Sequence, residues 1–298
     1  MRDLLLFAVA LLLTLGAFFT ADQWARGRQL DSAGLNVRGY RGALLGAKQP
    51  NALRYVLLGD SVAFGYGVRE TETLSTRLGE SLTRLLNRPV NVANLAFNGE
   101  SAVCYPSTLD LYAGLEPDGV VIYAARTDST TEAAVRDPAT CARNQAPLSR
   151  WTGYQPALPQ AIREKYFQLR YGTIDAGYAE QERRVPRIDS SQSAPRIATS
   201  LEVEAVYRAR LGDLISAQLL RGRQVVLVRG FQRDEEPVID SIRERFQESS
   251  AFVYVDLRGQ IDPSDPAESF DGVHLTAFGS AKAAGVIASS LSAMLAGA

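Results

Sequence analysis

The chain has 298 residues, and its 32 Lys and Arg nearly balance its 33 Asp and Glu, which gives a net charge of −1. This length allows one domain with a sizeable core plus an appendage. The balanced charge, with no run of basic residues, argues against a nucleic-acid-binding protein. The single histidine and the two widely separated cysteines do not make up an ordinary zinc site, so we predict neither a metal nor another cofactor.

Residues 4–21 carry no charge and are mostly Leu, Ala, Phe and Val. This length is at the lower edge for crossing a bilayer. A cleaved signal peptide usually has a shorter apolar part followed by a small-residue cleavage site, and no clear Ala-x-Ala motif is present after this run. We therefore favour an uncleaved transmembrane signal anchor over residues 1–21. Such a segment usually exports the domain behind it, so the globular part is expected outside the cytoplasm, in the periplasm or at the cell surface.

Residues 22–51 are polar, contain glycine and show no clear period, which is typical of a linker. Residues 52–298 then alternate strand and helix patterns. Strands are predicted at 55–58, 90–97, 119–125, 224–229 and 252–257, and helices at 72–86, 107–114, 202–220, 236–248 and 276–295. This alternation predicts a parallel sheet with helices on both faces, in a three-layer, doubly wound α/β domain. In the first of these helices a row of leucines should face the core, namely Leu74, Leu78, Leu82 and Leu85.

Residues 129–200 interrupt the alternation with several prolines and one charged helical piece at 161–169. So long an insertion is usually functional or disordered. Because it comes after the third strand, we expect it near the sheet edge where the strands end. Cys104 lies before that strand and Cys141 lies in the insertion. The two would pair in an exported domain and stay as buried thiols in a cytosolic one, and the sequence leaves both open.

The first strand ends in a glycine turn, Gly59-Asp60-Ser61, and Gly65 and Gly67 come shortly after it. A serine at the carboxyl end of a parallel strand lies where open α/β sheets bind ligands. The alternative is a plain turn in which Asp60 and Ser61 bond backbone donors. A phosphate site built on the glycines is weaker, because both the P-loop spacing and the G-x-G-x-x-G pattern are absent.

A nucleophilic serine needs a base within hydrogen-bond reach, and the chain offers one histidine, His274, just before the last predicted helix. Asp271 precedes it by three residues, so in a tight turn its carboxylate can fold back onto the imidazole. The alternative is a helix-entry loop with an exposed histidine. Acyl transfer also needs oxyanion donors, which the backbone N–H groups of Ser61 and Gly99 can supply.

These three motifs together resemble the SGNH/GDSL hydrolase superfamily. They are Gly59-Asp60-Ser61, Gly99 after its strand, and Asp271-x-x-His274 before the last helix. The resemblance covers the chain from residue 54 to the C-terminus, apart from the insertion. It implies a flavodoxin-like, three-layer α/β/α fold with a five-stranded parallel sheet and hydrolysis of acyl esters.

The resemblance also implies a role for each residue. Ser61 is the nucleophile, His274 the base and Asp271 its orienter. The family's third oxyanion donor is an Asn, and here Thr127 takes that position within Ala125-Arg126-Thr127-Asp128. The threonine hydroxyl can donate one hydrogen bond, but it is shorter than the amide and it rotates.

The sequence therefore predicts a membrane-anchored serine esterase acting on O-acyl groups of envelope carbohydrate or on small esters. Members of this family also serve as partners of membrane O-acyltransferases, so acyl transfer to a polysaccharide stays open. The other class of function is a non-catalytic subunit of a membrane complex. A Ser61–His274 distance far beyond about 3.5 Å would favour that class.

Overall fold

The computed structural model describes residues 2–30, 35–124, 141, 156–172, 200–231 and 237–297. Five parallel strands form one sheet in the order β2-β1-β3-β4-β5. The strands are β1 (Leu53–Leu58), β2 (Val90–Asn94), β3 (Gly119–Ala124), β4 (Gln224–Arg229) and β5 (Phe252–Asp256). This is the flavodoxin-like strand order of a doubly wound sheet. The predicted five-stranded, three-layer α/β fold is confirmed.

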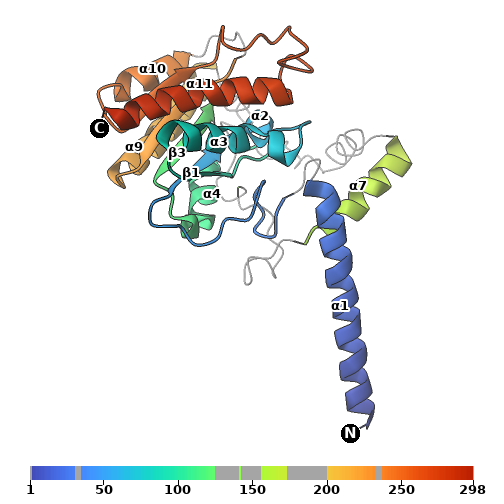
Figure 1. The fold of residues 1–298 in the computed structure, drawn as a ribbon. Coiled ribbons are helices and arrows are strands. Elements are labelled where there is room, and N and C mark those ends of the chain that lie inside the picture. Colours follow the sequence, from blue (N-terminus) through green and yellow to red (C-terminus); the bar gives the residue numbers. More distant parts are fainter. Residues whose placement is uncertain are drawn as a thin grey trace, which may run out of the picture.

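Helices cover both faces of the sheet (Figure 1). One face carries α3 (Leu74–Leu86) and α11 (Ala277–Ala296); the other carries α4 (Tyr105–Leu111), α9 (Ser200–Leu220) and α10 (Pro237–Phe246). Successive strand residues point to opposite faces, so Val56 and Leu58 join one apolar cluster while Tyr55 and Leu57 join the other. Burial on both faces explains why β1, β3 and β4 are nearly uniform apolar runs.

Shorter elements connect these helices to the sheet. They are α2 (Ser61–Phe64) and the 3₁₀ turns η1 (Glu70–Glu72) and η2 (Ala113–Leu115). On α3, the buried row has i+4 spacing through Leu74, Leu78 and Leu82, and it continues to Leu86. The expectation that Leu85 faces the core is wrong, since its side chain is 55% exposed.

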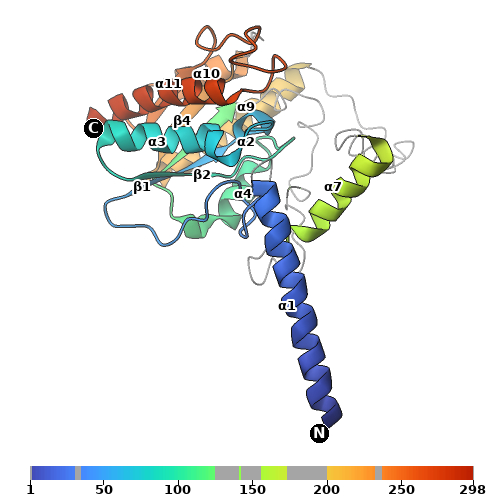
Figure 2. The same ribbon diagram turned by 45° about the vertical axis from the view of Figure 1, so that its right-hand side comes forward.

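Helix α1 (Arg2–Leu30) projects from the domain, with its amino end farthest away (Figure 2). The most apolar 18-residue stretch within residues 2–26 has a mean hydropathy of 2.5, and none of that stretch is buried. A second helix of the described chain, α11, also has the length to cross a bilayer. Its most apolar stretch has a lower mean hydropathy of 1.2, and the helix packs into the core. The helix with an uncovered apolar surface is therefore α1.

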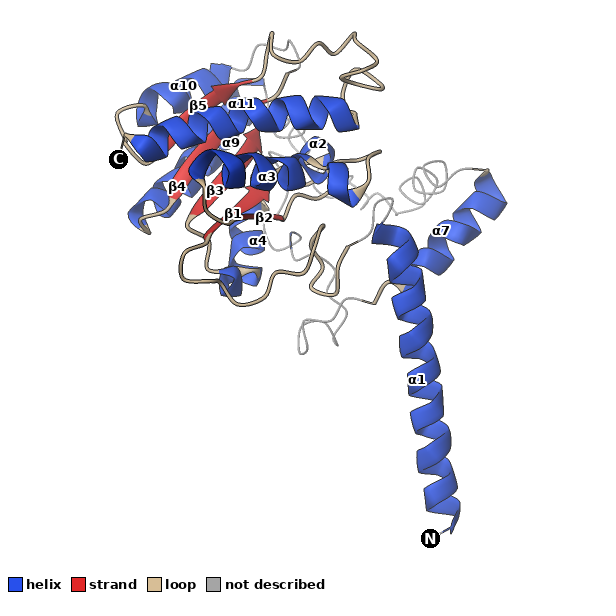
Figure 3. Cartoon of the chain, viewed as in Figure 1, coloured by secondary structure: helices blue, strands red, loops and turns tan. Residues whose placement is uncertain are grey.

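Helix α1 continues past residue 21 into the segment expected to be a linker. The start of α7 (Leu158–Tyr171) lies beside the carboxyl-terminal part of α1 (Figure 3). Asp22 Oδ1 accepts hydrogen bonds from the N–H groups of Ala157 and Leu158, at 2.6 and 2.7 Å. Its other oxygen pairs with Arg26 at 3.1 Å, and both side chains are buried. Asp22 thus acts as the N-terminal cap of α7, a helix that contains the predicted piece 161–169.

Residues 35–51 pack against the domain. Tyr40 and Arg41 are both 1% exposed. The Arg41 guanidinium lies 4.7 Å from the centre of the Phe64 ring and donates to the carbonyls of Gly65 and Val68. Burial lowers the pKa of Arg41 to about 10, with Glu70 partly offsetting the effect, so the guanidinium stays charged at neutral pH. This segment therefore braces the loop after β1.

Cys104 and Cys141 form a disulfide that closes a loop with a sequence separation of 37. The alternative of two buried thiols is not what the structure shows. The disulfide joins Cys104, at the start of α4, to Cys141 in the insertion.

We expect Cys104→Ser to lower the free energy of unfolding by about 3–4 kcal/mol, because the cross-link restricts the unfolded chain. Denaturant unfolding of the variant and of wild type, each with and without reductant, measures this. Cys141→Ser is the matched variant and should behave alike. Two free thiols in the intact mass of the non-reduced wild-type protein would contradict the bond.

We expect Asp22→Ala to speed proteolysis within residues 156–172, because it removes the acceptor of two helix N–H groups and the ion pair of Arg26. Loss of such buried contacts costs about 1–3 kcal/mol locally. Limited proteolysis coupled to mass spectrometry measures the rate. Asp3→Ala, at the exposed start of α1, is the control. Equal cleavage of the two variants would show that Asp22 does not hold α7.

Candidate active site

Ser61 opens α2 directly after the turn that ends β1. The Asp60 carboxylate caps this short helix by accepting from the N–H of Val62 at 3.0 Å. The plain-turn interpretation therefore holds for Asp60. It does not hold for Ser61, whose hydroxyl is directed at another loop.

Gly59 is required by close packing. A Cβ at this position would lie 2.5 Å from the Cβ of Ala63 and 3.1 Å from that of Tyr123. Its carbonyl accepts from the N–H of Phe97 at 3.1 Å, after β2. The turn is thus fixed between β3 and the segment after β2, which sets the position of Ser61.

His274 reaches Ser61 from the loop between β5 and α11. Its Nε2 lies 2.9 Å from the Ser61 Oγ, although the two residues are 213 positions apart. Its Nδ1 lies 2.6 Å from Asp271 Oδ2. Because the carboxylate can only accept, Nδ1 carries the proton, and Nε2 is left to accept from the serine hydroxyl. The structure brings the three predicted side chains together in the predicted order.

Asp271 is held by its own loop. Its Oδ1 accepts from the N–H groups of Val273 and His274 at 2.9 and 2.7 Å. Partial burial raises the pKa of Asp271, but these bonds and the His274 ring outweigh it and hold the pKa below its ordinary value. Asp271 is therefore ionised at neutral pH, and its stabilising effect on the loop is lost only as the pH falls through this lowered pKa.

Polar contacts hold the loop that carries Asp271 and His274 at two places. Just before Asp271, the Glu268 carboxylate pairs with Lys282 of α11 and accepts a hydrogen bond from the N–H of Asp262 at 2.9 Å. A Cβ on Gly279 would lie 2.0 Å from the Glu268 carbonyl oxygen, so only glycine lets the loop sit on the first turn of α11.

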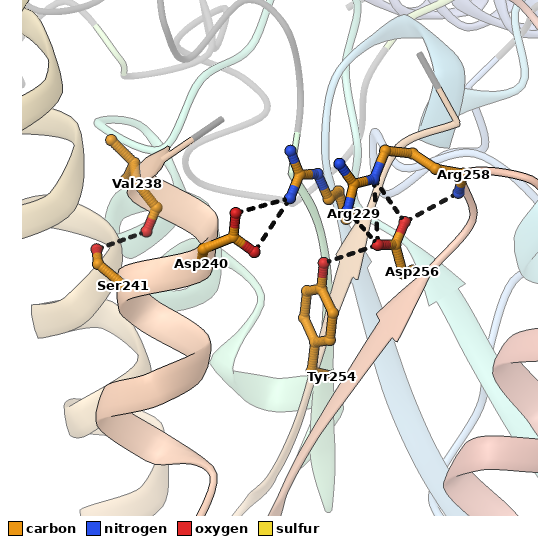
Figure 4. A network of polar contacts seen from close by, with 7 residues as sticks. All are labelled: Arg229, Val238, Asp240, Ser241, Tyr254, Asp256 and Arg258. Atoms are coloured by element: carbon orange, nitrogen blue, oxygen red, sulfur yellow. Dashed lines mark hydrogen bonds and ion pairs between the residues drawn. The ribbon is translucent and has the colours of Figure 1, made fainter. Parts of the chain in front are cut away.

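At its start, directly after β5, the loop is held by a polar network at the carboxyl ends of β4 and β5 (Figure 4). Asp256 pairs with Arg258 at 2.6 Å and accepts from the Tyr254 hydroxyl at 3.3 Å. Burial raises the pKa of Asp256, yet its bonds to Arg258 outweigh that and lower it. Beside it, the buried Arg229 binds both oxygens of Asp240 at 3.2 Å, which ties β4 to the start of α10.

The predicted oxyanion donors are described only in part. Gly99 lies in the turn after β2 with a φ of +70°, a conformation that favours glycine, and a Cβ there would meet nothing within 4 Å. The N–H of Glu100 closes this turn by donating to Phe97 at 2.9 Å. Thr127 lies outside the described residues, as do its neighbours Arg126 and Asp128. The roles of Gly99 and Thr127 stay predictions.

Sequence reasoning missed Arg41, which lies in the segment taken for a linker. An arginine beside a tyrosine in a glycine-rich segment gives little signal, since its contacts with Gly65 and Val68 exist only in the folded chain. Within the described ranges, no group of three His, Cys, Asp or Glu side chains is placed to hold a metal ion.

We expect Gly59→Ala to destabilise the domain by about 1–3 kcal/mol, because its methyl group cannot fit against Ala63. Gly114→Ala is the matched control, since a Cβ there meets nothing within 4 Å. Denaturant unfolding compares the two. Equal stability of both variants would mean that the turn can move away from α2 without cost.

No family model and no curated protein matches the chain. Solved structures do match it over most of its length. A psychrotrophic esterase from Pseudoalteromonas sp. has a TM-score of 0.47 and 11% identity, covering 82% of this chain and 98% of its own. A lipase/acylhydrolase from Enterococcus faecalis has a TM-score of 0.47 and 15% identity, covering 81% and 96%.

A catalytic mutant of an acetylxylan esterase from Geobacillus stearothermophilus has a TM-score of 0.43 and 11% identity, covering 84% of this chain and 96% of its own. At these scores and identities, we base the function on the geometry of the site itself. The chain is similar in structure, with little identity in sequence, to solved esterases and acylhydrolases and to a protein of the G-D-S-L family from Desulfitobacterium hafniense.

Proposed function

We propose that this protein is a serine acyl-ester hydrolase of the SGNH type with Ser61 as its nucleophile. The observation that carries the proposal is the continuous series of hydrogen bonds from Asp271 through His274 to Ser61, at 2.6 and 2.9 Å. Both distances suit direct proton transfer and orientation of the base. The short Ser61–His274 distance favours an enzyme over a non-catalytic subunit of a membrane complex.

The direction of these bonds sets the order of the reaction. The Ser61 Oγ attacks the ester carbonyl carbon while His274 Nε2 takes its proton. Asp271 stabilises the imidazolium that forms. The carbonyl oxygen becomes an oxyanion that accepts from the N–H groups of Ser61 and Gly99 and from the Thr127 hydroxyl. His274 then gives its proton to the departing alcohol, which leaves an acyl-enzyme.

Water completes the cycle. His274 takes a proton from the water as its oxygen attacks the acyl carbon, and the Ser61 oxygen leaves and regains the proton. The free acid departs. One oxyanion donor is typically worth about 100- to 1000-fold in rate, so Thr127 in place of an Asn is where we expect this enzyme to differ from its family.

We place the enzyme at the outer side of a membrane, held by α1 as an uncleaved anchor. The exposed apolar surface of α1 supports membrane insertion. The buried contacts of Asp22 and Arg26 support retention of the helix, because its last turns belong to the fold. The disulfide supports an oxidising compartment. O-acyl groups of envelope carbohydrate are the substrates we expect there, with small esters as the simpler case.

Acyl transfer to a polysaccharide shares the first half of this reaction and differs in the acceptor. In that version a membrane O-acyltransferase supplies the acyl group, and a sugar hydroxyl takes the place of water. The contacts between α1 and α7 suit this version as well as the esterase, because either enzyme would work close to the membrane.

We expect a fluorophosphonate probe to label the wild-type protein and not Ser61→Ala, because the probe reacts with an activated serine hydroxyl. Asp271→Asn should lower kcat on a chromogenic acetyl ester by about 10⁴-fold, since the imidazole would lose its proper tautomer. His274→Ala should lower kcat on the same ester by a similar factor.

Ser250→Ala is the control, because this exposed serine precedes β5 at the opposite edge of the sheet. Equal labelling of wild type and Ser61→Ala would refute the nucleophile. Labelling without hydrolysis, together with acetyl transfer to an added oligosaccharide, would identify the transferase version.

A further inference from the structure

The imidazole of His274 is flanked by two aromatic side chains. The Phe270 ring lies nearly parallel to it, with centroids 5.6 Å apart and an interplanar angle of 13°. The Tyr66 ring lies 5.0 Å away at 46°. Phe270 comes from the loop that carries His274, whereas Tyr66 comes just after the helix that carries Ser61. Each side of the candidate site thus contributes one ring.

Gly67 seats the Phe270 ring. A Cβ on Gly67 would lie 2.6 Å from Phe270 Cζ and 2.7 Å from Cε1, and the φ of +83° already favours glycine. The position of Ser61 is set by Gly59 and Asp60 and does not need a glycine at 67. The positive φ and the close approach to Phe270 together account for this glycine, and the approach joins the loop after β1 to the loop after β5.

The backbone of the histidine loop fixes the other end of Phe270. The N–H of Phe270 donates to the His274 carbonyl at 3.3 Å, and the Ser269 hydroxyl donates to the same carbonyl at 2.9 Å. The Ser269 hydroxyl also accepts from the N–H of Gly272 at 3.0 Å. The loop is thereby closed on itself, and the backbone of Phe270 cannot move away without breaking these bonds.

This arrangement matters because hydrogen bonds at Nδ1 and Nε2 leave the imidazole free to tilt about the line between them. A ring stacked on its face removes that freedom. Stacking of aromatic rings is worth a few-fold to about tenfold in an equilibrium, and a flanking π face also attracts the imidazolium.

We propose that Phe270, seated on Gly67, and Tyr66 are positioning residues that hold the His274 imidazole in the plane where Nε2 reaches Ser61. The kinetic part rests on the proposed function. The structural part concerns the imidazole alone and can be tested without any substrate.

The single histidine makes the test direct, because ¹⁵N-histidine labelling of the full chain in nanodiscs gives one imidazole spectrum. In wild type, we expect the proton on Nδ1 of His274 to exchange slowly with water. Phe270→Ala and Gly67→Ala should both lose this slow exchange, while Phe270→Trp should keep it. Phe278→Ala, which removes another exposed phenylalanine, is the control.

On an acetyl ester, Phe270→Ala should lower kcat about tenfold with little change in KM, and Phe270→Trp should recover most of the loss. Phe270→Leu keeps apolar packing without a ring, and it should resemble Phe270→Ala if stacking matters. Slow exchange and kcat within twofold of wild type in Phe270→Ala would overturn the proposal. So would a loss of activity in Phe270→Trp equal to that in Phe270→Ala.

Failure of the proposed function would look different. If Ser61→Ala keeps full turnover while the imidazole proton still responds to Phe270→Ala, the esterase assignment falls and the positioning of His274 stands.

Discussion

The hydrogen bond between Ser61 and His274 depends on the whole sheet, because its two partners lie beyond strands that are not neighbours. Strands β3 and β4 lie between β1 and β5, which separates β1 from β5 by roughly 14 Å at the usual strand spacing. The loop after β5 must cross that distance along the carboxyl edge. A shift in the register of any intervening pair would move the base away from the serine. The Ser61–His274 hydrogen bond can therefore form only when all the strands are paired in the correct register.

Polar contacts, in addition to the packing of Phe270 on Gly67, hold the loops at this edge. Glu268 and Lys282 fasten one end of the histidine loop, and Asp256 and Arg258 fasten the other. The buried Arg41 braces the serine loop from a different part of the chain. Burying charged groups is costly unless they are paired, and removing one partner costs more than the pair contributes. Such contacts make the edge specific in its geometry, while the two apolar clusters supply the stability.

Much of the fold and of the candidate triad could be predicted because the signals are local. Uniform apolar runs mark β1, β3 and β4, and the four-residue Asp271–His274 motif contains both the base and its orienter. The prediction is weaker for residues whose contacts are with residues far away in the sequence. The hydrogen bonds of Arg41 depend on Gly65 and Val68, and the close packing at Gly67 depends on Phe270. No window of sequence around either residue contains the group it contacts.

Boundaries and faces show the same limit. The buried row of α3 keeps its i+4 spacing to Leu86, whereas the recurrence of leucines on one helix face predicts Leu85. The apolar composition of α1 fades after residue 21, but the helix runs on to Leu30, with contacts of Asp22 to Ala157 and of Arg26 to Leu35 beyond that point. Hydropathy shows where the apolar stretch ends, whereas the end of the helix depends on packing.

On the proposed anchor, the contacts at the end of α1 would set the height of the domain above the membrane. A domain on a loose tether samples many heights above a bilayer, so any acyl group within the radius of the tether can reach it. A domain whose anchor helix is bonded to the segment that packs on it, as Arg26 is to the carbonyl of Leu35 at 2.9 Å, is held at nearly one height. On the proposed anchor, Ser61 then works in a thin layer parallel to the membrane. A polymer would be processed only where its own path brings an acyl group into that layer.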